Sequence, residues 1–493
     1  MTTQQSRQAH TTDTPIGLVN IAVHGHFYQP PREDPFTGII PEEPGAHPYP
    51  NFNELITAQC YRPNAEAGNF HSMSFNVGPT LASWLEKAHP DVHQQMVDAD
   101  HVHHNALAQV YNHTILPLAS ERDKQTQILW GMQDFRARFG REPYGLWLAE
   151  TAVDLDTLEV MARCGLRFTI LSLEQAAGAQ EIDITEPYLE PYLVRLPSRR
   201  TMTVIFYNPL SGSVSYNDAD TADANTFAAS YQRYYLNHEK ATAGTPQMTV
   251  IATDGELYGH HKAFRDKFLT HFLQRSADAY GLKVFCSLER YLDARPATTE
   301  VTIKGPSSWS CWHGVDRWNH GCSCDGTSTD EQRAWKPALR HSMESLQARS
   351  DRLFEDYAGG ILHDVWAARD DYIALRNGWE APERFWSRHA RRSRSDIEFI
   401  QLAQDLLEAQ YWLQAGFTSC GWFFEDLDRI EPRNNMAFAR KAISLIWLAT
   451  NHDLQKDFLK DLARARSWKT GCTGADLYHS LPAVPAHFLP PTR

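Results

Sequence analysis

The feature that most constrains the fold is the alternation of short β-rich runs with longer helical stretches over about the first 300 residues. Strands that alternate with helices of about 10–15 residues are typical of βαβ units and a parallel sheet. About seven strands fit either an incomplete, seven-stranded β/α barrel or an open, doubly wound sheet. The predicted strands are Leu18–Val23, Val102–Ala106, Tyr144–Ala149, Phe168–Leu171, Thr201–Tyr207, Met248–Thr253 and Leu282–Phe285.

Polar residues at or just beyond the ends of these strands favour the barrel. They are His24, His26, His103, His104, Glu150 and Asp254. In α/β barrels the active site is assembled at the carboxyl ends of several strands. An open sheet also binds ligands beyond its strand ends, so the pattern leaves that alternative open. We predict an α/β fold with an incomplete seven-stranded barrel.

From about Gln332 the pattern changes to long segments with apolar residues three and four positions apart, and β-rich runs become scarce. These segments predict an all-helical C-terminal domain. The expected organisation is a catalytic barrel over 16–305, a Cys/Trp-rich loop over 306–330 and a helical domain over 331–480. The predicted helices are Glu331–Leu353, Asp364–Asn377, Glu380–Arg391, Asp396–Gln414 and Arg433–Asn451.

Composition excludes several classes of partner. The 493 residues carry 47 basic and 60 acidic side chains, a formal charge of −13, whereas nucleic-acid binding usually leaves a basic footprint. No run of about 18 apolar residues suggests a membrane span, and the polar segment Met1–Pro15 does not resemble a secretory signal. Eight cysteines are too few for a secreted disulfide framework. We expect a cytoplasmic protein with reduced thiols.

Two carboxylates stand where predicted strands end. Glu150 closes the run that begins at Gly145, and Asp254 follows Met248–Thr253. Two acids from different strand ends can face one another, which is the arrangement that glycosidic cleavage needs: one attacks or stabilises the sugar centre and the other protonates the leaving oxygen. The alternative is that each acid caps the helix that follows it.

Five short blocks, in order along the chain, make it similar to glycoside hydrolase family 57. The first four match well, whereas the fifth has Gly421 where the family usually carries an Asp before the Trp. The resemblance implies a seven-stranded barrel, action on α-linked glucans with retention of configuration, and no cofactor or catalytic metal. It identifies Glu150 with the nucleophile and Asp254 with the acid/base. The blocks are His24–Pro30, Tyr111–Leu118, Gly145–Glu150 with Asp154, Thr253–His260 and Ser419–Phe424.

The expected substrate is therefore an oligo- or polysaccharide, handled by a hydrolase, a branching enzyme or a 4-α-glucanotransferase. The sequence does not separate hydrolysis from transfer and does not give the oligomeric state. Trp147 and Trp422 could equally serve in packing. The residues expected to bind the substrate are His24, His26, His113, Trp147, Glu256, His260, Trp309 and Trp422.

Two other functions remain open at this stage. A metal-dependent carbohydrate deacetylase or hydrolase on a related barrel would use His24 and His26 with Asp254 as ligands. A carbohydrate-binding protein without catalysis is the second, and its one support is the departure at Gly421.

The segment after the predicted barrel contains four soft metal ligands within 14 positions: Cys311, His313, Cys322 and Cys324. Such a set could hold a tetrahedral structural zinc, although its C-x-H and C-x-C spacings are tighter than the usual finger spacing. The alternatives are a cleft loop with free thiols, or a disulfide. The loop resembles that of an uncharacterised subgroup of the same family.

Overall fold

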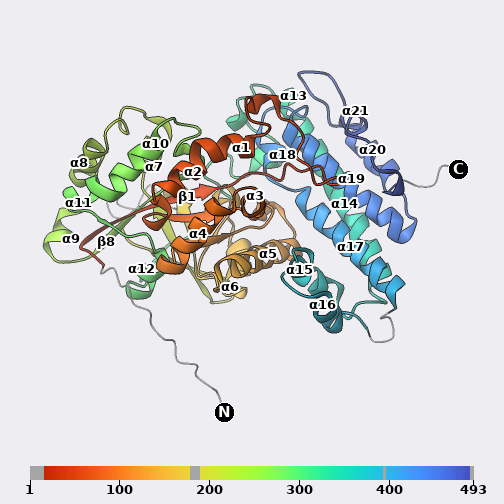
Figure 1. The fold of residues 1–493 in the computed structure, drawn as a ribbon, viewed down its shortest axis with the longest axis horizontal. Helices are drawn as coiled ribbons and strands as arrows, with labels where there is room; N and C mark the ends of the chain where they lie inside the picture. The colour runs from red at the N-terminus through yellow and green to blue at the C-terminus, as the bar shows by residue number, and fades with distance from the viewer. Residues whose placement is uncertain (1–15, 178–188, 392–395, 489–493) are drawn as a thin grey trace, which may run out of the picture.

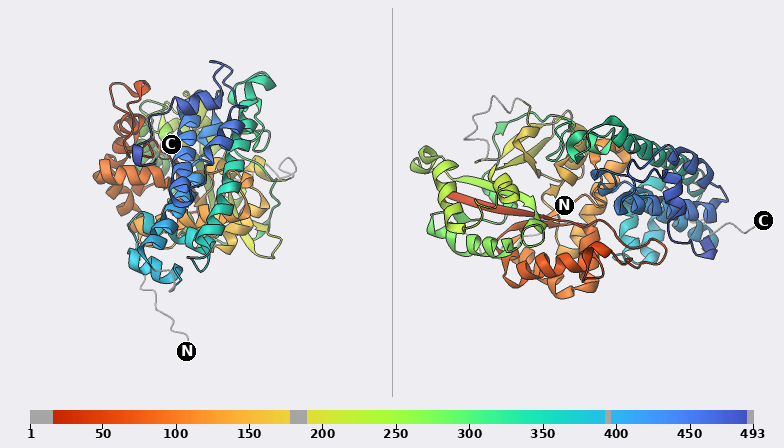
Figure 2. Two further views of the ribbon diagram at one scale, coloured as in Figure 1. Left: turned by 90° about the vertical axis from the view of Figure 1, so that its right-hand side faces the viewer. Right: turned by 90° about the horizontal axis from the view of Figure 1, so that it is seen from above.

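The computed structural model describes residues 16–177, 189–391 and 396–488. A β/α part built from the first 300 residues lies beside a helical part built from the remainder (Figure 1). The view from above shows the same separation, with the strands on one side and the long C-terminal helices on the other (Figure 2). The predicted change of pattern near Gln332 therefore corresponds to a change of architecture.

Parallel strands form the larger sheet, in the order β4-β3-β2-β1-β8, with β9 also paired to β1. A smaller sheet has the order β10-β6-β7-β5, in which β5 and β7 are parallel. The strands are β1 (Val19–Phe27), β2 (Ser74–Val77), β3 (Ala106–Gln109), β4 (Leu146–Trp147), β5 (Phe168–Ser172), β6 (Tyr192–Arg195), β7 (Thr201–Tyr207), β8 (Gln247–Asp254), β9 (Lys283–Val284) and β10 (Thr299–Glu300).

Two short backbone contacts join the two sheets into a ring. Beside β4, Gly145 forms a single parallel bridge with Phe168 of β5. Beyond β7, the Asn208 N–H donates to the Val250 carbonyl of β8 at 2.7 Å. The ring therefore runs β1-β2-β3-β4-β5-β7-β8. The incomplete seven-stranded barrel predicted from the sequence is confirmed.

Strand β1 is central to this ring. All nine of its residues are buried, because β2 and β8 cover both edges and helices cover the outside. Its pairing with β8 is in register from Val19 with Gln247 to His26 with Asp254. That register places His26 and Asp254 side by side at the carboxyl end of the barrel.

The barrel helices follow from ordinary local signals, as α5 (Glu121–Phe139) illustrates. Ser120 caps its first turn by accepting from the Asp123 N–H at 3.2 Å. Gly140 ends it in the left-handed conformation, at φ 68°. Within α5, Gly131 lets the helix approach β3 so closely that an added Cβ would lie 1.9 Å from the Gln109 carbonyl oxygen.

Long helices pack side by side in the C-terminal part (Figure 1). One hydrophobic cluster unites them with barrel residues such as Tyr111 and Trp130. Trp130 donates from Nε1 to the Arg369 carbonyl at 2.9 Å, and Arg369 forms a buried ion pair with Asp123. No helix among the described residues is long and apolar enough to cross a membrane. The main helices are α14 (Trp335–Ala358), α15 (Val365–Arg376), α16 (Pro382–His389), α17 (Ile397–Ala415) and α19 (Ile430–Thr450).

One predicted strand was wrong. The segment Val102–Ala106 lies mostly in and after α4 (Pro90–His103), and β3 begins only at Ala106. His103 and His104 therefore precede β3 at the opposite end of the barrel from Asp254, because β3 runs parallel to the other strands. The strand β2 was not predicted, since the polar Ser74 and Asn76 leave no apolar run among its four residues.

The close contact at Gly131 predicts a large effect for one methyl group. We expect Gly131→Ala to lower the free energy of unfolding by at least about 2 kcal/mol, because the strand backbone cannot move aside. Gly212→Ala is the matched control: a Cβ there meets nothing within 4 Å. Urea unfolding of the two variants measures the difference, and equal midpoints would contradict this packing.

Candidate active site

Glu150 stands on a strained turn immediately after β4. Both Glu150 (φ 55°) and Thr151 (φ 49°) have the left-handed backbone conformation, which is costly for residues other than glycine. The Trp309 N–H donates to the Glu150 carbonyl at 3.2 Å and to Thr151 Oγ1 at 3.0 Å. Gln175 Nε2 donates to the Thr151 carbonyl at 2.8 Å. These bonds hold the turn so that the Glu150 side chain is presented at the strand end.

Two donors orient the Glu150 carboxylate. Its Oε2 accepts from Ser310 Oγ at 2.7 Å and from Trp309 Nε1 at 3.1 Å. Burial raises the pKa of Glu150, while these hydrogen bonds and the charge of Arg317 partly offset that effect. The carboxylate is thus fixed in direction, and its two donors limit the upward shift that burial imposes on its pKa.

Asp254 ends β8 and has a different environment. Burial, and then the negative charges of Glu150 and Glu256, raise the pKa of Asp254 well above its ordinary value. The side chain keeps solvent-accessible surface, but the crowded strand ends and both neighbouring charges disfavour its ionised form. The effect of Glu150 on Asp254 means that the two carboxyl groups, from strands far apart in the sequence, lie within electrostatic reach of one another.

Neither acid is a helix cap. Asp254 makes no side-chain hydrogen bond to the turn that follows it. After Glu150, the cap of α6 (Leu155–Arg163) is Asp154, whose Oδ1 accepts from the Thr157 N–H at 2.7 Å. The capping alternative for the two candidate acids is therefore excluded.

Five rings from the same strand ends stack nearly parallel, in the order Tyr28, His113, His26, Trp147 and His24. Tyr28 lies 3.9 Å from His113 at an interplanar angle of 12°, and His113 lies 5.1 Å from His26 at 10°. Trp147 lies between His26, at 5.1 Å, and His24, at 4.9 Å. The stack joins β1, β4 and the segment after β3.

Hydrogen bonds assign the tautomers of this stack. Asn76 Nδ2 donates to His26 Nδ1 at 2.9 Å, so His26 Nε2 carries a hydrogen and donates to His113 Nε2 at 3.1 Å. His113 Nδ1 then donates to Ser419 Oγ at 2.7 Å. Asn76 Oδ1 accepts from His24 Nε2 at 3.0 Å. The three imidazoles are held as neutral rings.

Burial supports the neutral state. It lowers the pKa of His24 and of His113 to about 3 each. Burial, and then the neighbouring His113 and His24, lower the pKa of His26 well below its ordinary value. Ser74 Oγ forms a hydrogen bond with His24 Nδ1 at 2.9 Å. Every ring nitrogen of these three histidines therefore has a protein partner. Among the described residues, His24, His26 and Asp254 do not form a converging metal-ligand set.

Glu256 and His260 follow Asp254 in the chain, and both contact other protein side chains. Glu256 is buried, and its Oε1 accepts from the Tyr28 N–H at 3.1 Å and from Tyr61 OH at 2.7 Å. Burial raises the pKa of Glu256 to about 7. His260 is half-buried, with Nδ1 2.7 Å from Gln59 Oε1.

A family model described as glycosyl hydrolase family 57 matches residues 2–304. The chain belongs to glycosyl hydrolase family 57. A second model, described as a domain of unknown function (DUF3536), matches residues 332–487. The family resemblance drawn from the five sequence blocks is thereby confirmed.

Individual proteins are also similar to this chain. Alpha-amylase 1 of Dictyoglomus thermophilum is 27% identical over 112 residues, which cover 22% of this chain and 16% of that relative. The exo-type maltose-forming amylase of Pyrococcus sp. ST04 has a TM-score of 0.73 at 15% identity, covering 93% of this chain and 88% of the other. A branching enzyme of Thermococcus kodakaraensis has a TM-score of 0.58 at 14% identity, covering 93% and 96%. These structures share the fold.

This family 57 chain departs from the expected site at Trp422. The ring is fully buried, and Nε1 donates to the Lys336 carbonyl of α14 at 3.3 Å. The ring also stacks on Phe417, with centroids 6.1 Å apart. A Cβ at Gly421 would lie 2.0 Å from Asn435 Nδ2, so Asn435 fills the space that a side chain at 421 would need.

Trp309, by contrast, is placed beside Glu150. Its half-buried ring meets Trp147 edge-on at 5.2 Å. A cavity of about 850 Å³ at the junction of the barrel and the helical part is lined by Trp84, Tyr111 and Trp379 among others, and not by Glu150 or Asp254.

Sequence reasoning missed three residues of this site. Ser310 donates to Glu150 across 160 positions of sequence, and no local pattern marks it. Tyr28 and Cys420 lie within the first and fifth family blocks, and the charge of Glu150 contributes to raising the pKa of each, after burial. Their place inside those blocks was the available signal.

The raised pKa of Glu256 predicts a pH-dependent stability. Because the folded protein binds a proton at Glu256 up to about pH 7, and the ordinary value is 4.5, the free energy of unfolding falls as pH rises through this interval. Relative to Glu256→Gln, we expect the wild type to lose about 3 kcal/mol between about pH 4 and pH 9. Urea unfolding across pH measures it. Glu42→Gln, at an exposed position, is the control, and parallel profiles for all three proteins would refute the assignment.

Proposed function

We propose that this chain is a retaining enzyme that cleaves α-linked glucans by double displacement. The single observation that carries the proposal is the unlike environment of two acids within electrostatic reach: Glu150 is oriented by two donors, whereas burial and two neighbouring negative charges raise the pKa of Asp254 well above its ordinary value. Pairs of titratable groups whose surroundings separate their roles are characteristic of acid–base sites. The amylase and branching-enzyme activities of the structural relatives support the same substrate class.

In the first step a Glu150 oxygen forms a bond to the anomeric carbon while the glycosidic bond breaks. Asp254 gives its proton to the departing oxygen, so the leaving sugar is released as an alcohol. In the second step Asp254 takes a proton from water or from a sugar hydroxyl, which attacks the anomeric carbon and frees Glu150. Water gives hydrolysis and a sugar hydroxyl gives transfer; the chemistry of the two acids is the same.

The stacked rings act as positioning residues in this proposal. His26 lies beside Asp254 through the β1–β8 register, and Trp147 ends β4 three residues before Glu150. His24, His26 and His113 already bond to protein partners, so we assign them to holding Trp147 and Tyr28 in place. Trp309 is the aromatic residue that we expect to contact the sugar, because its ring is half-buried beside Glu150.

Removing either acid should abolish turnover. We expect Glu150→Gln and Asp254→Asn each to lower kcat by about 10³-fold or more on α-linked oligosaccharides, with unchanged unfolding midpoints. Glu174→Gln, an exposed acid near the same strand ends, should retain wild-type activity. Wild-type turnover in either acid variant would end the proposal.

Product analysis on the same substrates tests the stereochemistry and the acceptor. Retention predicts an α-configured first product by NMR, and the products show whether chains are shortened, lengthened or branched. A β-configured first product would contradict the attack by Glu150.

Ser310 provides a graded test through pH. The Ser310 hydroxyl favours the ionised form of Glu150, so its loss should raise the pKa of Glu150 further. Glu150 must be ionised to attack, and the acidic limb of the kcat/KM profile should therefore move to higher pH in Ser310→Ala. Ser323→Ala, which removes an exposed hydroxyl in the same loop, is the control. If the acidic limb of Ser310→Ala lies at the same pH as that of the wild type, the assignment of Glu150 as the attacking group is contradicted.

A further inference from the structure

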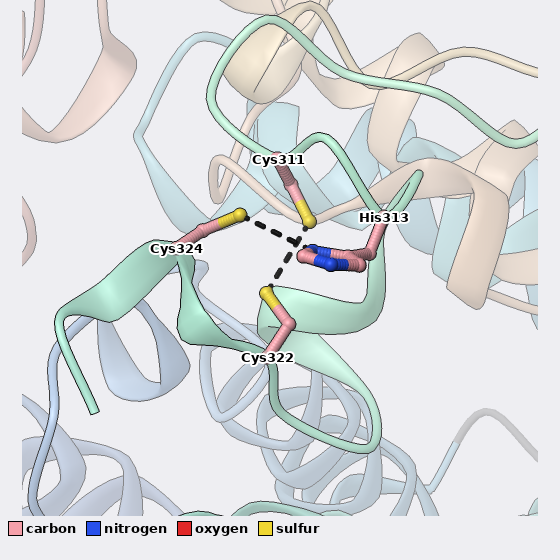
Figure 3. Close-up of side chains that lie close together, drawn as sticks. All are labelled: Cys311, His313, Cys322 and Cys324. Carbon is pink, nitrogen blue, oxygen red and sulfur yellow. Dashed lines mark hydrogen bonds between the residues drawn. The ribbon is translucent and has the colours of Figure 1, made fainter. Parts of the chain in front are cut away.

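The loop between the barrel and the helical part brings four metal-ligand side chains to one point. The sulfurs of Cys311, Cys322 and Cys324 and a ring nitrogen of His313 all lie within 4.8 Å of one another (Figure 3). Cys311 Sγ is 3.6 Å from Cys322 Sγ, and Cys324 Sγ is 3.4 Å from His313 Nδ1. Figure 3 shows the four side chains pointing inward from two short stretches of the loop.

Two of these separations, 3.6 Å and 3.4 Å, are close to the edges of a tetrahedral zinc site. Zinc bonds of about 2.3 Å to sulfur and about 2.0–2.1 Å to nitrogen place two sulfurs about 3.8 Å apart, and a sulfur and a nitrogen about 3.5 Å apart. A disulfide would require the two sulfurs at about 2.05 Å. The observed 3.6 Å between Cys311 and Cys322 is too long for a disulfide and close to the spacing of two sulfurs on one zinc ion.

Backbone N–H groups surround the candidate ligand sulfurs. Peptide N–H groups of His313 and Arg317 lie near the Cys311 sulfur, that of Cys324 lies near the Cys322 sulfur, and that of Trp312 lies near the Cys324 sulfur. Such donors around a ligating sulfur are the outer shell that metal sites need. Cys311 and Cys322 are buried, whereas His313 is exposed.

The next residues anchor the loop to the helical part. Asp325, directly after Cys324, forms a buried ion pair with Lys336 of α14 at 2.5 Å. Lys336 Nζ also donates to the Arg317 carbonyl at 3.1 Å. The two halves of the loop, each carrying two of the candidate ligands, are thus tied to the same lysine.

We propose that Cys311, His313, Cys322 and Cys324 bind one structural Zn²⁺. Three thiolates and one imidazole in a tetrahedron are a combination that zinc favours, and four protein ligands leave no open position for substrate. The ion closes the loop and takes no part in the chemistry. Binding releases the protons of those thiols that are still protonated.

The site has a consequence for Glu150, a step that rests on the proposed function. The ligand Cys311 directly follows Trp309 and Ser310, the two donors to the Glu150 carboxylate. Arg317, between the two ligand pairs, donates from Nη1 to the Ser310 carbonyl at 2.9 Å. Zinc would therefore fix the loop that orients Glu150, and its loss should act on Glu150 as the loss of Ser310 Oγ does.

Metal analysis of the full chain, purified in reductant without added metal, tests the site. We expect about one zinc per chain, released to a chromogenic chelator, and the visible spectrum of tetrahedral thiolate-bound cobalt after exchange. The double variant Cys322→Ser/Cys324→Ser should lose the metal, and His313→Ala should bind it more weakly. Cys472→Ser, a free cysteine elsewhere in the chain, should retain it. Wild type that contains no zinc and binds none on titration overturns the proposal, as does a Cys311–Cys322 disulfide in reductant.

Activity of the metal-free chain tests the link to Glu150. We expect zinc removal to move the acidic limb of the kcat/KM profile to higher pH and zinc addition to restore it. If the wild type contains zinc but its removal does not move the acidic limb, the link to Glu150 is refuted. The proposal of a structural zinc site is then unaffected. A failure of the proposed function gives a different result: Glu150→Gln would then be fully active, with the same zinc content as the wild type.

Discussion

The pairing of β1 with β8 is the interaction on which the rest of the site depends. It places His26 beside Asp254 at one end of the barrel, and the burial of all nine β1 residues fixes the register. A shift by one residue would turn the histidines away from Trp147 and remove the partners of the ring stack. The position of the candidate acid is therefore a property of the core as much as of the site.

Two further features adjust the acids once the barrel is formed. Burial, and then the charges of Glu150 and Glu256, raise the pKa of Asp254. Burial also raises the pKa of Glu256 itself, to about 7. The loop that follows the barrel supplies Trp309 and Ser310 to Glu150 and supports the strained turn beneath it. One acid is thus set by its strand neighbours and the other by a segment about 160 positions away, which accounts for their unlike surroundings.

The helical part contributes through contact with the barrel. Ser419 accepts from His113 at the end of the ring network, and Lys336 of α14 holds the loop that carries Trp309. Gly421, which departs from the family pattern, is explained by Asn435 of α19, because that side chain occupies the space a larger residue would need. The matches to two separate family models, over 2–304 and 332–487, follow the same two parts of the chain.

The sequence by itself determined the alternation of strands and helices, the change to helices near Gln332, and the two acids at strand ends. These follow from local periodicity, which depends on neighbours only a few positions away. It misplaced His103 and His104, because the strand was predicted to begin at Val102, four residues before β3 begins at Ala106, and it could not find Ser310. Only the tertiary structure decided which acid has donors, that the buried Trp422 serves packing, and that four ligands of one loop converge. Such relations join residues far apart in the chain, and packing, which no local pattern encodes, brings them together.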